Sequence, residues 1–256
     1  MELRGRTILI TRAATQSEEL RTGLEAAGAF VIECPAIEIV PVEDWTEVDY
    51  AAARLPGYDW LILTSTNAAT YFLERLNTLG LTCSVPIAAI GVATAARLAA
   101  FCLRASRIPA DFRAEGLLAL FEQDLTGKRI LIPRAETARE ILPNELRRRG
   151  ATVDVVTVYR TIKPQGALTG IRETLSREEI DAVVFTSPSA IRNVAEVLGE
   201  DFVSSLGSIP IAVIGPVAQQ AVGAAGLQVR ILPERATIQD LIQAIRSYFS
   251  SRRPYT

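Results

Sequence analysis

The second half of this chain repeats the first at a nearly constant distance. Residues 5–15 return at 127–137, 122 positions later, with seven of the eleven residues identical. Further along the chain the offset becomes 124, and residues 86–91 return at 210–215. A helical solenoid would need a much shorter period. Two copies of a unit of this length in 256 residues predict two similar domains or half-domains.

Each copy alternates short β-rich runs with helical patterns. The runs are almost continuously apolar, which is typical of strands covered on both faces of a parallel sheet. Helices are predicted over 16–27 and 138–149, and each is followed by a glycine, Gly28 or Gly150, that suits the position after a helix. The predicted fold class is α/β, with doubly wound, flavodoxin-like parallel sheets. The predicted strands cover residues 7–10, 60–63, 87–90, 130–132, 182–185 and 211–214.

The chain contains no histidine, and this excludes several common kinds of catalytic site. A Ser-His-Asp triad, a Cys-His pair, a histidine base and a histidine-ligated metal are all impossible. Neither a G-x-G-x-x-G motif nor a P-loop motif is present, so dinucleotide binding and P-loop phosphate binding lack support. We therefore expect no metal and no cofactor.

Charge and cysteine content narrow the partners and the compartment. Lys and Arg number 27 against 29 Asp and Glu, so no positive field attracts nucleic acid or an anionic membrane. The cysteines Cys34, Cys83 and Cys102 form no C-x-x-C pair, which argues against a disulfide framework and a zinc site. No apolar run reaches membrane-spanning length, and the N-terminus does not resemble a signal peptide. We expect a cytoplasmic protein.

Hydroxyl-bearing and small residues gather directly after the predicted strands. In α/β sheets, ligands bind beyond the C-terminal strand ends, where helix N-termini present free N–H groups. Ser187 followed by Pro188 is the pattern of a helix cap, and capping alone explains any single junction. Several such junctions in two copies also suit a ligand with many carboxylates or phosphates. They lie at residues 11–13, 64–67, 91–94, 186–189 and 215–216.

The two copies differ at one position of chemical interest. Residue 159 is a tyrosine where the first copy has Ile37. A tyrosine at a strand end is more often a packing residue than an acid, and both interpretations stay open. Both copies then leave the strand, and residues 39–41 and 163–164 are expected to be connections. The basic run 147–149 is either a helix end that complements the helix dipole or an anion-binding patch.

Taken together, these segments resemble the uroporphyrinogen-III synthase family from Gly5 to about Ile245. The resemblance implies two flavodoxin-like domains joined by a two-stranded linker, with an active-site cleft between them. It places 1–37 and 164–256 in one domain and 38–163 in the other, so the domains are not the sequence repeats. The segments that carry the resemblance are 8–13, 158–161, 185–190, 214–216 and Pro233 followed by Thr237.

The resemblance also implies a reaction and a set of site residues. The family cyclises hydroxymethylbilane, a linear tetrapyrrole with eight carboxylates, to uroporphyrinogen III with loss of water and inversion of ring D. This is a lyase reaction without cofactor or metal. Tyr159 matches the tyrosine proposed to assist departure of the substrate hydroxyl, and Ala93 offers no side-chain donor at its turn. Thr94, Thr237, Ser187 and Ser189 match substrate-binding hydroxyls of the family, and Ser65, Arg12 and Arg134 join them by position at strand ends.

A second function class remains compatible with the sequence. A non-catalytic, two-lobed protein that closes on a small polyanionic ligand would use the same duplicated α/β lobes. Tyr159, which breaks the symmetry of the repeat, favours the enzyme. For the enzyme we expect a monomer that takes its substrate by transient contact with the preceding pathway enzyme.

Overall fold

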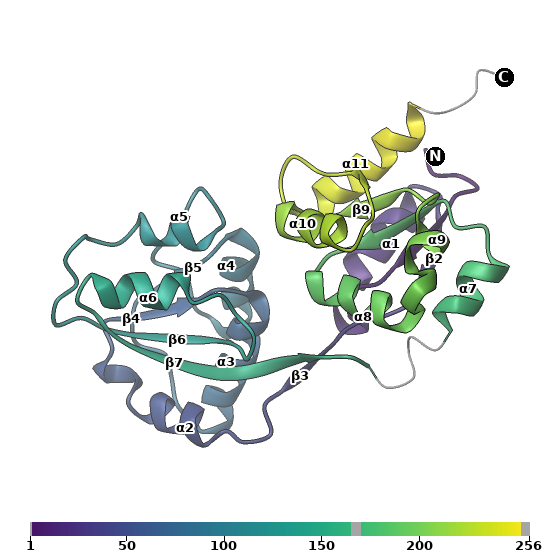
Figure 1. Ribbon diagram of the computed structural model, residues 1–256. Coiled ribbons are helices and arrows are strands. Elements are labelled where there is room, and N and C mark those ends of the chain that lie inside the picture. The colour runs from purple at the N-terminus through teal and green to yellow at the C-terminus, as the bar shows by residue number, and fades with distance from the viewer. Residues whose placement is uncertain (1, 165–169, 252–256) are drawn as a thin grey trace. The chain divides into compact units, whose positions relative to one another are not determined.

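The computed structural model describes residues 2–164 and 170–251, and its contacts divide the chain into two units (Figure 1). Unit 1 contains residues 1–39 and 162–256, and unit 2 contains residues 40–161. Each unit is built on its own five-stranded sheet. The chain therefore passes from one unit to the other twice, within the strands Glu38–Pro41 and Thr152–Ile162.

The sheet of unit 1 has the strand order β10-β9-β8-β1-β2, and its neighbouring strands run parallel. One face packs on α7, α8, α9 and α10 through a core that includes Phe185 and Ile191. The other face packs on α1 and α11 through residues such as Leu24 and Ile245. The elements are β1 (Thr7–Ile10), α1 (Glu18–Ala26), β2 (Phe30–Glu33), α7 (Ile171–Arg177), β8 (Ala182–Phe185), α8 (Pro188–Leu198), α9 (Phe202–Leu206), β9 (Ile211–Val213), α10 (Pro216–Ala224), β10 (Val229–Ile231) and α11 (Ile238–Ser250).

The sheet of unit 2 has the order β3-β7-β6-β4-β5. Helices α5 and α6 cover one face, where Ile62 and Ile130 lie in the core. Leu61 and Leu63 point to the opposite face because side chains alternate along a strand, and there α3 packs on β4 and β6. The elements are β3 (Glu38–Pro41), α2 (Thr46–Ala53), β4 (Trp60–Leu63), α3 (Thr66–Thr78), β5 (Ile87–Ala89), α4 (Val92–Leu98), α5 (Ala114–Leu118), β6 (Arg129–Ala135), α6 (Ile141–Arg148) and β7 (Thr152–Ile162).

The strand order confirms the predicted fold class. Numbered along unit 1, its strands follow the flavodoxin-like order 2-1-3-4-5. The sheet of unit 2 repeats the first four positions of this order with β7, β6, β4 and β5, but its fifth strand, β3, lies beside β7 at the opposite edge. The crossing strands β3 and β7 are neighbours in that sheet, and the Val42 N–H donates to the Val158 carbonyl at 3.4 Å just beyond β3. They form the predicted two-stranded linker.

The sequence repeat is shared between the two sheets. Strands β1, β2, β4 and β5 of the first copy correspond to β6, β7, β8 and β9 of the second. The first sheet contains the run β9-β8-β1-β2 and the second the equivalent run β5-β4-β6-β7. Each of these four-stranded runs thus combines two strands from each copy.

Several local predictions need correction at their boundaries. Residues 39–41 are not a connection but part of β3, because pairing with β7 orders them. The helix predicted from residue 16 begins at Glu18, after a 3₁₀ turn at Ala14–Gln16. The helix predicted over 138–149 is the shorter α6. Gly28 and Gly150 follow their helices with φ of 100° and 94°, so the predicted helix ends are confirmed.

Candidate active site

Ser65 and Tyr159 meet at the C-terminal end of the strands of unit 2. Ser65 follows β4 and is the N-cap of α3, where its Oγ accepts a hydrogen bond from the Ala68 N–H at 3.0 Å. The same Oγ lies 3.2 Å from the Tyr159 hydroxyl, and either oxygen can be the donor. A helix cap and the candidate acid are therefore linked directly.

Tyr159 lies near the end of β7 and is 8% exposed. Its carbonyl accepts from the Glu136 N–H at 3.0 Å, at a register shift where Ala135 of β6 pairs with Tyr159. The ring is stacked on that of Tyr71, with centroids 5.9 Å apart and planes 24° from parallel. Tyr159 is thus held by backbone, hydroxyl and ring together.

Tyr71 is the residue of this group that sequence reasoning missed. It lies on α3, and burial raises the pKa of its phenol, with smaller contributions from Glu74 and Tyr159. The repeat carried a signal for it, because its equivalent in the second copy is Asn193. The Asn193 Nδ2 donates to the Ala36 carbonyl at 2.8 Å, next to Ile37, which is the equivalent of Tyr159. The same helix position therefore contacts equivalent segments of the chain in the two units.

Arg134 and Thr94 complete the candidates of unit 2. Arg134 lies at the end of β6, forms an ion pair with Glu140 and has a side chain only 15% exposed. Its Nη1 is buried and has no hydrogen-bond partner among the described residues. Thr94 lies in the first turn of α4 and is 3% exposed. It follows Gly91, where a Cβ would come within 3.1 Å of the Phe112 ring.

The candidates of unit 1 lie at the corresponding ends of its strands. Ser187 caps α8, and its Oγ accepts from the Ala190 N–H at 3.2 Å, so the cap predicted from Ser187 and Pro188 is confirmed. The Ser189 Oγ accepts from Arg192 at 3.1 Å. Ser187 occupies the position of Ser65 in the repeat, and both residues cap their helices in the same way.

Arg12 and Thr237 are already engaged in local contacts. Arg12 follows β1, and its Nε donates to the Gln16 carbonyl at 2.8 Å. Burial lowers the pKa of its guanidinium, and Glu19 partly offsets this. Thr237 caps α11: its Oγ1 accepts from the Asp240 N–H at 3.1 Å and donates to the Asp240 carboxylate. The Thr237 hydroxyl therefore keeps one lone pair for a ligand.

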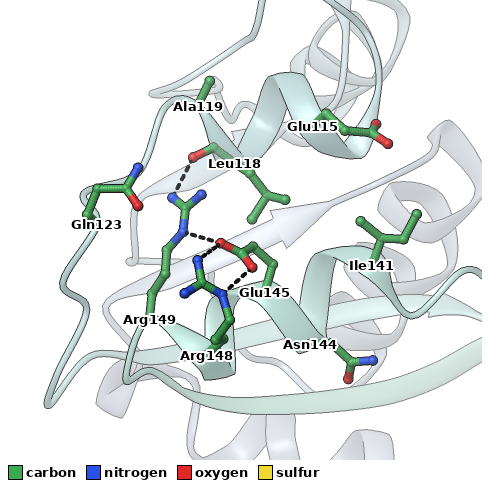
Figure 2. Close-up of a pocket in the computed structure, with 9 residues that line it drawn as sticks. All are labelled: Glu115, Leu118, Ala119, Gln123, Ile141, Asn144, Glu145, Arg148 and Arg149. Carbon is green, nitrogen blue, oxygen red and sulfur yellow. Dashed lines mark hydrogen bonds and ion pairs between the residues drawn. The ribbon is translucent and has the colours of Figure 1, made fainter.

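A cavity of about 610 Å³ lies between α5 and α6, and none of these candidates is among the residues that line it (Figure 2). Glu145 accepts from Arg148 Nε at 2.7 Å and from Arg149 Nε at 3.0 Å. Arg149 Nη1 also donates to the Leu118 carbonyl at 2.8 Å. Arg147 donates to the Val153 carbonyl at 2.9 Å. All three arginines of the basic run have partners within the chain, which favours the structural interpretation of that run.

Two kinds of feature are absent from the described parts of the chain, 2–164 and 170–251. No group of three or more Cys, Asp or Glu side chains is placed there to hold a metal ion. No helix in those segments is long and apolar enough to cross a membrane.

Comparisons with known proteins agree with one another. The family model described as uroporphyrinogen-III synthase HemD matches residues 18–243. Uroporphyrinogen-III synthase of Synechococcus elongatus is 36% identical, covering 95% of this chain and 96% of the relative. That of Chlorobaculum parvum is 28% identical, covering 90% of this chain and 93% of the relative.

Solved structures show the same fold at lower identity. A uroporphyrinogen III synthase structure from Thermus thermophilus superposes with a TM-score of 0.68 at 18% identity, covering 97% of this chain and all of that one. The uroporphyrinogen-III synthetase of Helicobacter pylori gives a TM-score of 0.61 at 18% identity, covering 95% of this chain and 99% of that one.

Proposed function

Because this chain belongs to the uroporphyrinogen-III synthase family and is thus an enzyme of porphyrin biosynthesis, we propose that Tyr159 assists its cyclisation of hydroxymethylbilane. The hydrogen-bonded pair of Tyr159 and Ser65 carries this proposal, because it places a buried phenol where several strands end. The alternative, a binding protein without catalysis, is not favoured by the family model or the relatives.

The reaction proposed for Tyr159 begins with departure of the hydroxyl of the bilane. The phenol donates its proton to that hydroxyl, the C–O bond breaks with its electron pair on oxygen and water leaves, so that Tyr159 becomes a phenolate and the pyrrole a protonated azafulvene. The electrophilic azafulvene is attacked by the substituted carbon of ring D, and a C–C bond forms in a spiro intermediate. The bond between that ring D carbon and the methylene to ring C then breaks, and the methylene bonds to the other α-carbon of ring D. This carbon loses a proton, which restores the Tyr159 phenol, and ring D is inverted. This sequence is a lyase reaction.

The other candidate side chains are proposed to hold the eight carboxylates of the substrate. Both units offer hydroxyl and guanidinium groups at their strand ends, so we propose that both contribute to binding. The buried Arg134 Nη1, which lacks a partner among the described residues, supports a carboxylate contact there. Holding the flexible bilane in one conformer selects the isomer. The proposed substrate-binding residues are Thr94, Ser65, Arg134, Arg12, Ser187, Ser189 and Thr237.

We also propose that the enzyme acts as a cytoplasmic monomer that receives its unstable substrate by transient contact with the enzyme that makes it. The cysteines Cys34, Cys83 and Cys102, which form no disulfide with one another, support a reducing compartment.

An isomer assay tests the proposed activity directly. Hydroxymethylbilane is generated in place by the preceding enzyme, and the oxidised products are separated chromatographically. We expect isomer III with this protein and isomer I without it. Isomer I alone, with folded protein present, would contradict the activity.

A further inference from the structure

Helix α3 contacts Tyr159 at two points. Ser65 at the N-cap of the helix reaches the phenol oxygen at 3.2 Å, and Tyr71 within the helix stacks on the ring. All three residues belong to unit 2. One helix therefore contacts both the hydroxyl and the ring of Tyr159.

The hydrogen-bonding capacity of Ser65 restricts what its hydroxyl can do. A serine hydroxyl has one proton to donate and two lone pairs. One lone pair accepts the Ala68 N–H. If Tyr159 donates to the second lone pair of Ser65, the phenol proton is not available to the substrate. If Ser65 donates to the phenol oxygen, the phenol proton can point to the leaving hydroxyl, and the bond strengthens as negative charge develops on that oxygen.

The stacked ring of Tyr71 restricts the remaining freedom of Tyr159. A phenol can turn about its second side-chain torsion, which is broad in tyrosine. A neighbouring ring in offset-stacked contact opposes that turn. Burial raises the pKa of the Tyr71 phenol, so this ring stays neutral in the neutral pH range. In unit 1, where Ile37 replaces the tyrosine, the equivalent position is Asn193 and binds the backbone instead.

We propose that Tyr71 and Ser65 are positioning residues: Tyr71 fixes the ring plane of Tyr159, and Ser65 donates to its hydroxyl so that the phenol proton faces the substrate. This inference rests on the proposed role of Tyr159 in departure of the substrate hydroxyl. It reassigns the main role of Ser65 from holding substrate to orienting the acid.

A double-mutant cycle separates positioning from simple stabilisation. Tyr71→Leu removes the stacked ring. We expect it to lower kcat about tenfold and to change KM less than about twofold, and an interaction of this size is ordinary between residues in contact. In the Tyr159→Phe background the same change should lower kcat less than about twofold, because the hydroxyl that Tyr71 orients is absent. Tyr71→Phe, which keeps the ring, should retain at least about half of kcat.

Ser65 is tested with substitutions that keep the helix cap. Glycine at an N-cap costs only a few tenths of a kcal/mol, so Ser65→Gly removes the hydroxyl with little loss of stability. We expect Ser65→Gly to lower kcat about tenfold with KM nearly unchanged, and Ser65→Thr to restore it. A rise in KM with unchanged kcat would assign Ser65 to substrate binding and overturn this part of the proposal.

The remaining controls keep the outcomes distinct. Asn193→Ala is the matched change in unit 1, and it should leave kcat per folded molecule near the wild-type value. Equal losses from Tyr71→Leu in both backgrounds, or no loss in either, would overturn the positioning role. If Tyr159→Phe alone has full activity, the acid role fails and the inference with it, while formation of isomer III by the wild type would still support the proposed activity.

Discussion

The hydroxyl of Tyr159 is the atom that the proposed chemistry depends on most. Tyr159→Phe removes one oxygen from an 8% exposed side chain and keeps the ring stacked on Tyr71. We expect turnover to fall about 10²-fold, at the low end of the range for general acid assistance, because the hydroxyl of a pyrrolic carbinol leaves readily. Isomer III should remain the product, since positioning selects the isomer.

Steady-state turnover, product isomer and thermal midpoint together check the Tyr159 prediction. A lowered midpoint with unchanged turnover would make Tyr159 a packing residue. Ser65 keeps its hydrogen bond from the Ala68 N–H in the variant, so α3 should stay capped.

The sequence proposed candidate residues for the site one by one, but few of the contacts that the structure shows between them. Ser187 was predictable as a cap because Ser-Pro is a local signal, and Tyr159 stood out because it broke the repeat. Tyr71 was not found, since stacking on a residue 88 positions away leaves no local pattern. The hydrogen bond from the Thr237 hydroxyl to the Asp240 carboxylate likewise depends on the folded geometry, so the sequence did not predict it.

Among the elements, α6 ends in an ion cluster around Glu145, and Arg149 of this cluster also donates to the Leu118 and Phe121 carbonyls. Hydrogen bonds from Arg148 and Arg149 lower the pKa of Glu145 to about 2, from an ordinary value of 4.5 (Figure 2). The folded-state pKa is depressed, so the stabilisation is present above the unfolded value and is lost as pH falls towards the folded one.

Glu145→Gln should therefore lower the thermal midpoint at neutral pH. The difference from wild type should narrow as the pH falls from about 5 to about 3, where the wild-type group begins to lose its advantage. Salt should reduce the effect because the group is partly exposed to solvent. Thermal unfolding monitored by circular dichroism across this pH range measures the difference. The matched control is Glu115→Gln, which changes another carboxylate of the same cavity. A difference that is independent of pH would rule out the ionic contribution.

Strands were predicted correctly where their apolar side chains are buried, and were missed where pairing with a neighbouring strand determines the structure. The strands at 7–10, 60–63 and 182–185 were predicted with the bounds that the structure has, because apolar runs there are buried on both faces. Strand β3 was not predicted, since its residues at 38–41 are half exposed and become a strand through pairing with β7. The first helical turns of α1 and α6 were placed two or three residues early, at frayed boundaries.

On the scale of the whole molecule, exchanging the order of the two halves along the chain should not prevent folding or activity. Glu2 pairs with Arg246, so the chain ends near these residues can be joined by a flexible linker. New ends placed between the exposed Gln123 and Asp124 leave every strand pairing intact. We expect this circular permutant to fold and to produce isomer III. Opening the chain inside β7, between Asp154 and Val155, is the control that should not fold. A Gln123–Asp124 permutant without cooperative unfolding would contradict the prediction.

Catalysis should survive removal of metal ions. The 256 residues include no histidine, and the described segments contain no acidic or cysteine cluster suited to a metal. We expect unchanged turnover after treatment with a strong chelator and dialysis, with metal content measured by mass spectrometry. Lost activity that a divalent ion restores would refute this expectation.

The repeat predicted two similar α/β bodies, but not which strands would share a sheet. A duplication of this kind is equally compatible with two sequential domains, and the division of each copy between sheets depends on contacts far apart in sequence. The expectation that each domain combines parts of both copies came from the resemblance to a family and not from the repeat itself.

The division of the chain into units also determines an order of assembly on the ribosome. Unit 2 is one continuous segment, 40–161, and can be completed as soon as β7 has emerged. Strands β1 and β2 are synthesised first, yet β1 lacks its neighbour β8 until residues 182–185 appear. The nascent chain therefore carries an apolar N-terminal segment, unpaired on one side, through most of translation. An unpaired apolar strand edge of this kind is prone to aggregation, and the risk ends only when β8 pairs with it.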